Sequence, residues 1–317
     1  MPTIARRPLG ASGLQVSELS LGSWRTYERI PRETGIAVMK TARELGINFL
    51  DDARYNDETG TAPLKSGYSE VVFGDLFRAS GWKRDEVVVA NKLWWEFWPQ
   101  QRAAAELDES LQRMGLDHLD LVYAERPPKG LTMEEIVHDV TALIDAGKAR
   151  AWGVLNWKPD LVAEAGVVAA AQGVEPPCAA QLPYSLVHRS MVEDPRMTAA
   201  LDAAGARVVA SFSLMGGALT GKYAVPGASG RLSGDVNNES YQPALKAASE
   251  LQDFASAHET MPATMAIAFA LLDPRVASVL FGATSPQQLT ENVKAAALAT
   301  AMDGDAVAEL RRIGLEQ

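Results

Sequence analysis

Short apolar runs recur along the chain, separated by longer segments in which apolar residues follow a helical repeat. Runs of three to six residues, apolar on both faces, are typical of strands in a buried parallel sheet. We assign eight strands on this basis, at residues 19–22, 47–50, 87–90, 119–124, 149–154, 179–181, 208–210 and 278–281.

The segments between these runs predict helices at residues 34–45, 69–77, 102–114, 133–146, 161–171, 197–203 and 286–297. Strict alternation of strands and helices predicts a parallel sheet with crossover helices. Eight such units favour closure of this α/β protein into a (β/α)8 barrel, the TIM-barrel architecture, over an open sheet. Residues 7–16, around Gly10 and Gly13, predict a β-hairpin ahead of the first barrel strand.

Length and composition are consistent with one large domain spanning residues 1–317, because barrels of this kind commonly run to this size. No apolar run approaches the roughly 20 residues of a membrane span, and the N-terminus lacks the apolar stretch of a secretory signal. A net charge of −10 argues against general binding to nucleic acid or anionic membranes. We therefore expect a cytoplasmic protein that binds neither nucleic acid nor membranes.

Cysteine and histidine usage narrows the chemistry further. Cys178 is the only cysteine, so no internal disulfide can form. The four histidines lie far apart and form no metal-binding pair on one helix, so no metal site is expected.

Three residues form a candidate proton-donating unit. Asp51 and Tyr55 follow the second strand run, and Lys92 ends the third. A tyrosine hydroxyl has an ordinary pKa of about 10, so it donates its proton at neutral pH only if a neighbouring cation eases the loss. Lys92 is the candidate cation and Asp51 its charge partner. The alternative is a structural ion pair beside a core tyrosine.

The predicted barrel favours the catalytic interpretation. Active sites of such barrels lie at the carboxyl ends of the strands. Asp51, Tyr55, Lys92 and Glu125 all fall at or just after the ends of the second, third and fourth strands, so we expect their side chains in one mouth.

Motifs along nearly the whole chain resemble the aldo-keto reductase superfamily. They include Gly46-Ile47-Asn48-Phe49 before Asp51, Leu219-Thr220-Gly221-Lys222-Tyr223 and Gly282-Ala283-Thr284. Within the superfamily the chain is most similar to the branch of the voltage-gated potassium channel β subunits and their bacterial relatives. The resemblance implies an NADPH-dependent oxidoreductase that reduces an aldehyde, ketone or conjugated enone. A competing implication is a redox-sensing subunit that binds NADPH but turns over slowly, and a homo-oligomer is compatible with either.

Glu125 departs from the family pattern, in which a histidine usually follows the fourth strand. Two states of its carboxyl remain open. A neutral, buried carboxyl would donate a hydrogen bond to an enone oxygen and favour reduction of the double bond. If instead Lys92 or Arg126 lies within a few ångströms, Glu125 is ionised and only forms an ion pair.

Cofactor residues are assigned by the same resemblance, because no Gly-x-Gly-x-x-Gly fingerprint follows the first strand. The loop with Gly216, Lys222 and Arg231 is expected over the pyrophosphate. The 2′-phosphate is expected at the start of the last predicted helix. The residues assigned to that end of the cofactor are Gly282, Thr284, Gln288, Glu291 and Asn292.

The nicotinamide end matches the family less well. Asn156 and Gln181 are the candidate partners of the carboxamide, and Ser23 and Trp24 follow the first strand beside it. Ser211-Phe212-Ser213-Leu214 stands where the family has an aromatic residue followed by Ser-Pro-Leu, which makes the stacking ring uncertain at Ser211, Phe212 and Leu214. Asp51 also lies one residue closer to Tyr55 than is usual, so either Asp51 or Asp52 can face the site.

Aromatic residues cluster in the loops after the first and third strands, which predicts an aromatic pocket suited to a planar or hydrophobic carbonyl compound. They are Trp24, Tyr27, Trp94, Trp95 and Trp98.

Overall fold

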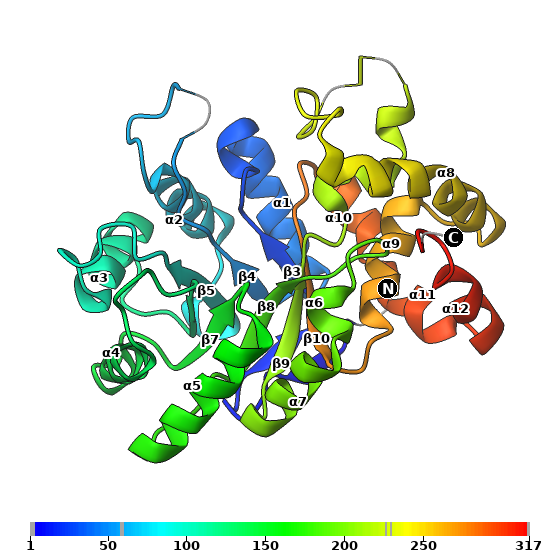
Figure 1. Cartoon of the computed structure of the whole chain (residues 1–317). Coiled ribbons are helices and arrows are strands. Elements are labelled where there is room, and N and C mark those ends of the chain that lie inside the picture. The colour runs from blue at the N-terminus through cyan, green and yellow to red at the C-terminus, as the bar shows by residue number, and fades with distance from the viewer. Residues whose placement is uncertain (1–3, 58–59, 226, 229, 316–317) are drawn as a thin grey trace.

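A closed ring of eight parallel strands forms the centre of the molecule, with helices around it (Figure 1). The computed structural model describes residues 4–57, 60–225, 227–228 and 230–315. In order around the barrel, the strands are β10 (Val276–Phe281), β3 (Leu19–Gly22), β4 (Phe49–Asp51), β5 (Val88–Leu93), β6 (Leu121–Ala124), β7 (Ala151–Leu155), β8 (Ala179–Pro183) and β9 (Arg207–Ser211). The predicted (β/α)8 barrel is confirmed.

Closure is made by the pairing of the last strand with the first. In register, β10 places Val279 beside Leu19 and Phe281 beside Leu21, and its other edge pairs with β9. A closed sheet has no free edge, so every strand is paired on both sides. All eight carboxyl ends consequently meet at one rim.

The predicted hairpin is present as β1 (Arg6–Pro8) and β2 (Gln15–Ser17), which pair antiparallel. Its turn contains Gly10 at φ +57°, where a Cβ atom would collide with the carbonyl oxygens of Cys178 and Gly205. Both carbonyls lie just before the amino ends of β8 and β9. The hairpin therefore closes the barrel at the end opposite the rim of strand carboxyl ends.

Alternation along each strand divides the core into two layers. Phe49 belongs to a cluster inside the barrel, which the hairpin residues Leu9 and Val16 complete, whereas Leu50 belongs to the larger cluster under the helices. Since side chains alternate between the two faces of a strand, Asp51 must point inward again.

Six barrel helices agree with the predicted segments to within a few residues: α1 (Arg32–Glu44), α2 (Tyr68–Ser80), α3 (Ala103–Met114), α4 (Met133–Asp145), α5 (Pro159–Gln172) and α7 (Pro195–Ala204). A further helix of the barrel, α9 (Pro262–Leu271), was not predicted. Short elements interrupt the loops: α6 (Ser190–Glu193), η1 (Tyr27–Arg29), η2 (Arg84–Glu86), η3 (Met215–Thr220), η4 (Lys222–Ala224) and η5 (Glu239–Tyr241).

The carboxyl-terminal part differs from the predicted helices. The segment at 286–297 is not one helix, because Val293 and Lys294 form a turn that separates two helices. It forms α10 (Pro286–Asn292) and α11 (Ala295–Ala301), followed by α12 (Gly304–Leu310). The amphipathic α8 (Gln242–Ala257), which was not among the predicted helices, packs on η3 and α9.

In the part of the chain that the structure describes, every helix is too short or too polar to cross a membrane.

Candidate functional site

A buried ion pair lies at the rim where β4 and β5 end. The Lys92 Nζ atom is 2.5 Å from the Asp51 Oδ2 atom, and both side chains are about 3% exposed. The Gln181 Nε2 atom donates to the same carboxylate oxygen over 3.0 Å. Burial raises the pKa of Asp51, while the hydrogen bonds from Lys92 and Gln181 favour the carboxylate. Sequence reasoning assigned all three residues to the site, and the structure brings them together.

The two neighbouring aspartates have different positions. Asp51 faces the barrel interior and holds Lys92, whereas the Asp52 carboxyl points to the outer side and accepts a hydrogen bond from the Ser23 hydroxyl. Asp52 contributes only its backbone oxygen to Lys92, at 2.5 Å from Nζ. The choice that the sequence left open therefore falls on Asp51 as the charge partner of Lys92.

Tyr55 does not contact Lys92 in this structure. Its hydroxyl accepts a hydrogen bond from the backbone N–H of Arg25 at 2.8 Å and interacts with Glu28. Burial and Glu28 raise the pKa of Tyr55 above its ordinary value. The expected arrangement, in which Lys92 lowers the pKa of Tyr55, is therefore not what the structure shows. The reason is that the loop after β4 turns Tyr55 toward the loop after β3.

A second tyrosine, which sequence reasoning missed, lies beside Lys92. Tyr123 pairs with Lys92 in register across β5 and β6, and the Lys92 Nζ atom is 5.7 Å from its ring centroid. Its ring fits because Gly153 has no side chain: a Cβ there would approach Tyr123 to 3.0 Å. Strand alternation was the available signal, since Tyr123 shares its inward face with Leu121. Tyr123 is fully buried, and burial raises its pKa.

Glu125 pairs with its neighbour rather than with the central cluster. Its Oε1 atom accepts the backbone N–H of Arg126 at 3.1 Å and lies 3.4 Å from the Arg126 Nε atom. The Glu125 side chain is 15% exposed. This geometry is the ion-pair alternative of the sequence analysis, in which Arg126 lies within a few ångströms of Glu125.

An open pocket of about 660 Å³ lies at the rim after β5, β6 and β7. Its wall contains Trp94, Glu125, Arg126, Pro127 and Asn156. An aromatic side, a carboxylate and an amide together suit a ligand with an apolar body and a polar group.

The predicted aromatic pocket is only partly formed. Trp94 lines the rim pocket and Trp24 is 37% exposed. Trp95 is instead buried, with its indole N–H donated to the Glu125 carbonyl oxygen over 3.1 Å, and Tyr27 is buried in η1. Trp98 stacks with the Arg102 guanidinium at 4.8 Å.

Positive charge gathers between the loops after β3 and β9, on the far side of the rim. The Arg231 Nη2 atom donates to the Trp24 carbonyl oxygen at 2.9 Å, and its guanidinium lies 5.1 Å from the Trp24 ring centroid. Burial and the nearby charges of Arg25 and Arg29 lower the pKa of Arg231. Three guanidinium groups this close favour an anionic ligand.

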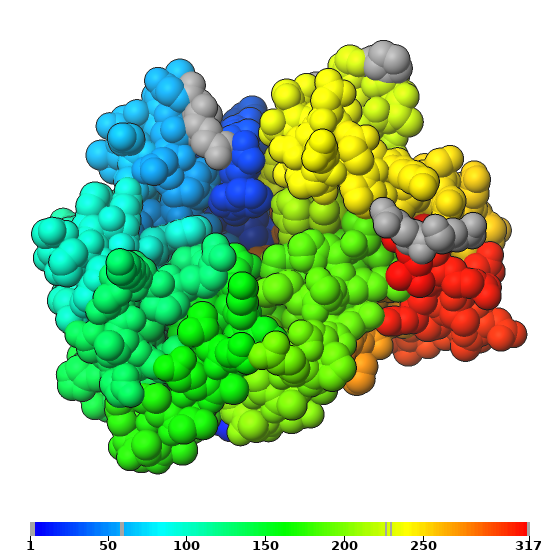
Figure 2. Space-filling view, in the orientation of Figure 1, coloured from blue at the N-terminus to red at the C-terminus, as the bar shows by residue number. Residues whose placement is uncertain are grey.

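Gly282 lies in this positive region as well. A Cβ atom at Gly282 would come within 2.9 Å of Thr26 Oγ1 and 3.8 Å of Arg231 Nη2. The missing side chain leaves room for a ligand close to the backbone. In Figure 2 the surface is hollowed between the blue segment near residue 60 and the yellow segment near residue 240.

The loop after β9 has the backbone that its glycines allow. Gly216 and Gly217 have φ of +65° and +96°, and the Lys222 side chain lies over the Tyr223 ring at 4.8 Å. Phe212 also has positive φ, and its ring lies 6.5 Å from Trp24. Phe212 thus supplies an aromatic ring near the rim, as the sequence left open.

The flanking residues of this segment have other neighbours. Ser211 ends β9, where its carbonyl oxygen accepts from the Tyr184 N–H over 2.9 Å. Leu214 packs against the main core.

Two of the predicted 2′-phosphate residues, Thr284 and Gln288, bond to each other. The Gln288 side-chain oxygen accepts from the backbone N–H and the hydroxyl of Thr284, at 3.0 and 2.9 Å. Ser285 caps α10 through the Gln288 N–H. Glu291 pairs with Lys294 at 2.5 Å, and Asn292 is buried.

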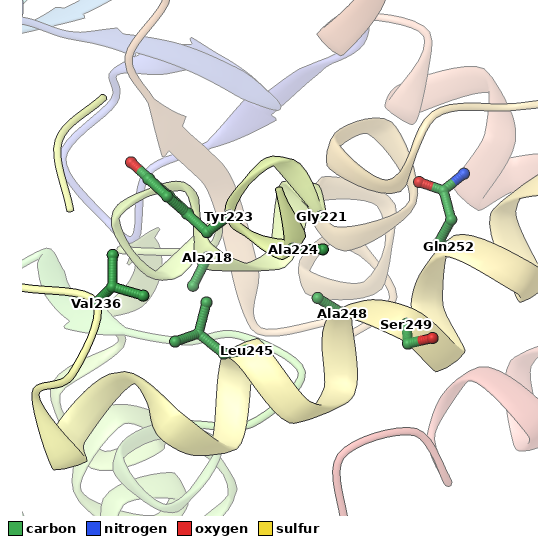
Figure 3. Close-up of a pocket in the computed structure, with 9 residues that line it drawn as sticks. All are labelled: Ala218, Gly221, Tyr223, Ala224, Val236, Leu245, Ala248, Ser249 and Gln252. Carbon is green, nitrogen blue, oxygen red and sulfur yellow. The ribbon is translucent and has the colours of Figure 1, made fainter. Parts of the chain in front are cut away.

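A separate apolar cavity of about 280 Å³ lies between the η3–η4 segment and α8 (Figure 3). Leu245, Ala248 and Ser249 of α8 lie opposite Ala218 and Gly221 in this view. Its lining lacks the carboxylates and ammonium groups of the rim, so it does not belong to the site built around Lys92.

Comparison with known proteins gives a consistent family. The sequence model of the Aldo/keto reductase family matches residues 18–314. A probable voltage-gated potassium channel subunit beta from Oryza sativa subsp. japonica is 31% identical over 306 residues, covering 90% of this chain and 89% of that protein. A putative voltage-gated potassium channel subunit beta from Schizosaccharomyces pombe is 32% identical over 309 residues, covering 91% and 87%. A probable subunit of the same name from Arabidopsis thaliana is 29% identical over 302 residues.

Asp52 predicts a pH dependence of the stability. Burial, and then the charge of Glu70, raise its pKa to about 7. Tyr27 and Lys92 also face it, from η1 and β5. The folded chain thus keeps a proton that the unfolded chain releases at an ordinary aspartate pKa. The free energy of unfolding contributed by this group falls as pH rises from about 4 through about 7, then levels off.

Asp52→Asn stays neutral at every pH and removes this loss. From pH 4.5 to pH 8.5, we expect the free energy of unfolding of Asp52→Asn to rise by ~3 kcal/mol relative to that of the unsubstituted chain. Urea unfolding of both proteins at the two pH values measures this difference. The contributions of the other titratable groups are the same in both proteins and cancel. An equal difference between the proteins at both pH values would show that Asp52 is ionised in the folded chain.

Proposed function

This chain belongs to the aldo/keto reductase family, and on that premise we propose that it is an NADPH-dependent oxidoreductase that reduces an aldehyde, ketone or conjugated enone. The observation that supports this most is the buried Lys92–Asp51 pair, which Gln181 also contacts. It lies at the same rim as the open pocket lined by Trp94 and Asn156. A buried ammonium beside an accessible pocket stabilises negative charge as it forms on a substrate oxygen.

The residues of the chain supply the proton and the electrostatics of the reaction. A bound nicotinamide supplies the hydride. We assign Tyr55 as the proton donor, turning its hydroxyl from the Arg25 N–H toward the substrate oxygen in the complex. Catalytic hydrogen bonds commonly become aligned only when the substrate is bound. Lys92 then lowers the pKa of the phenol, and Asp51 keeps the ammonium charged and in place.

Cofactor binding is assigned to the positive region beside the rim. Arg231 and Lys222 contribute charge, and Gly216 and Gly282 allow close backbone approach. Thr284 and Gln288 reach the 2′-phosphate once their mutual hydrogen bonds open. The remaining assigned contacts are Ser23, Trp24, Asp51, Asn156, Gln181, Ser211, Phe212, Leu214, Glu291 and Asn292.

Reduction at the carbonyl carbon is the better supported outcome for an enone. The neutral-donor role of Glu125 needs a proton on its carboxyl. Arg126 instead presents two donors to that carboxyl, one from the backbone and one from the guanidinium. A carboxylate held in this way accepts hydrogen bonds and does not polarise a substrate carbonyl.

A second function, slow turnover in a redox-sensing subunit, has its own support. The relatives named above are called potassium channel β subunits, and Tyr55 is held by Arg25 and Glu28 at a distance from Lys92. The two functions differ in the fate of bound NADPH. Rapid substrate-dependent loss of NADPH absorbance supports the reductase, and stable NADPH binding without such loss supports the subunit.

The cofactor assignment predicts a preference for NADPH. We expect NADPH to bind at least roughly tenfold more tightly than NADH, since charge-assisted contacts to one phosphate supply about 1.4 kcal/mol. We assign Arg231 to the 2′-phosphate together with Thr284 and Gln288, so Arg231→Met should reduce this ratio to within about threefold. Arg196→Met, an exposed guanidinium on α7, is the matched control and should leave the ratio unchanged. Fluorescence titration measures the six dissociation constants of the three proteins, and equal affinity for both nucleotides in the unsubstituted chain would exclude the assignment.

The proton-donor assignment predicts a loss of turnover in Tyr55→Phe. Removal of the hydroxyl should slow reduction on the order of 10²-fold or more, while the NADPH dissociation constant changes little. Tyr123→Phe is the matched control, because its ring lies beside the same ammonium and its hydroxyl is buried away from solvent. We expect it to retain activity within roughly threefold. If Tyr123→Phe lost the activity and Tyr55→Phe kept it, the donor would be Tyr123.

The pairing of Glu125 with Arg126 predicts the product from an enone. The unsubstituted chain should form the allylic alcohol, and Glu125→Gln should form the same product with kcat/KM within roughly threefold. Arg126→Gln removes the partner and should behave alike, because a pair this exposed contributes ~1 kcal/mol or less. Chromatography with mass detection identifies the product. A saturated ketone as main product would instead establish Glu125 as a neutral donor.

A further inference from the structure

A buried guanidinium lies next to the proposed proton donor. Arg54 directly precedes Tyr55, and its side chain is 3% exposed. Its Nη2 atom is 2.8 Å from Glu106 Oε1 and 3.5 Å from Glu96 Oε2. Glu106 belongs to the first turn of α3 and is 1% exposed, whereas Glu96 lies in the loop after β5. One cation thus joins the loop after β4 to two other segments.

Glu106 binds the loop after β5 through its backbone as well. Its Oε1 atom accepts the N–H of Trp94 at 2.6 Å, and its Oε2 atom accepts the N–H of Trp95 at 3.1 Å. The carboxylate that neutralises Arg54 therefore also fixes the residue whose indole lines the rim pocket. Buried charges of this kind are costly to leave unpaired, which restricts both loops to one arrangement.

Glu96 extends the connection to the base of the segment after Tyr55. The Ser66 hydroxyl donates to the Glu96 Oε2 atom at 3.0 Å. Ser66 forms a β-bridge with Asn56, and the Gly67 N–H donates to the Tyr55 carbonyl oxygen at 3.2 Å. The two ends of this segment, at Asn56 and Ser66, are thus connected to the loop that carries Trp94.

We propose that Arg54 is a positioning residue which, through Glu106 and Glu96, sets the distance between Tyr55 and the Trp94 wall of the pocket and so selects substrates by size. This assignment rests on the proposed function, because it takes Tyr55 and the rim pocket as the reaction site. The physical reason is that the planar guanidinium holds its Nη2 group in a fixed direction between the two carboxylates, which an ammonium on a flexible stem does less well. A rigid wall accepts ligands that fit it and excludes bulkier ones.

Substrate discrimination tests the proposal. The holoenzyme with NADPH is assayed on a compact and a bulky aromatic aldehyde, and the ratio of the two kcat/KM values is compared among variants. Arg54→Met should lower the ratio of the compact to the bulky aldehyde roughly tenfold, mainly because a looser wall lowers the KM of the bulky aldehyde. Arg54→Lys keeps the charge and should restore the ratio in part. An unchanged ratio in Arg54→Met, with a native circular dichroism spectrum, would overturn the proposal.

Arg84→Met is the matched control. Arg84 lies 2.7 Å from Asp120, a buried carboxylate that also accepts a backbone N–H, from Val89. This pair is at the opposite end of the barrel, so its loss should leave the substrate ratio unchanged. A shift equal to that of Arg54→Met would attribute the effect to general loosening and overturn the proposal.

Hydrogen exchange separates this proposal from the proposed function. In Arg54→Met, amides of residues 65–67 and 94–96 should exchange at least roughly fivefold faster than in the unsubstituted protein, and those in Arg84→Met should not. If no carbonyl compound is reduced, the proposed function fails, and these rates still decide whether Arg54 fixes the two loops. Unchanged rates in Arg54→Met would remove the connection itself.

Discussion

Pairing between β10 and β3 is the interaction on which the site depends. It closes the sheet, so strands far apart in sequence end at a common rim. Asp51 of β4, Lys92 of β5 and Gln181 of β8 meet there, although 130 residues separate the first from the last. An open sheet would leave β8 several strands away from β4. Closure therefore creates the cluster, and the sequence has only to place polar residues at the carboxyl ends of these strands.

Balance of buried charge is the second constraint at the rim. Asp51 is paired with Lys92, and Glu106 with Arg54. Burial and then the charge of Glu70 raise the pKa of Asp52 to about 7, since its carboxyl has a hydroxyl partner in place of a cation to offset them. The same low-dielectric environment that makes a paired charge rigid thus makes the poorly compensated one change protonation near neutral pH.

The position of Tyr55 connects the two functions considered for this chain. Lys92 is fixed by Asp51 from below, whereas Tyr55 is carried by a loop and bonded to Arg25. Because the cation is fixed and the donor lies on a loop, the chain can act as a reductase in which the bound ligand brings Tyr55 to Lys92. The same arrangement also allows a slow binding subunit if the loop retains Tyr55. The Arg54 network acts on this loop and therefore on the balance between the two.

The sequence by itself determined the architecture. Buried strands carry near-continuous apolar runs, and their alternation with helical segments identified all eight barrel strands, because hydrophobic periodicity is a local property of the chain. It failed at residues 286–297, because no glycine or proline after Pro286 marks the turn at Val293 and Lys294. Family motifs and the positions of strand ends also assigned Asp51, Lys92 and Gln181 to one site.

Only the tertiary structure decided which contacts these residues make. The sequence could not choose between Asp51 and Asp52, because the face of a side chain depends on the register of its strand in the closed barrel. It placed Tyr55 beside Lys92, whereas the loop after β3 supplies a competing N–H at Arg25. It also gave no sign of Arg54 as a connection to Glu106, 52 positions away. Loop conformation and long-range charge pairing follow from packing between distant segments, which no local pattern records.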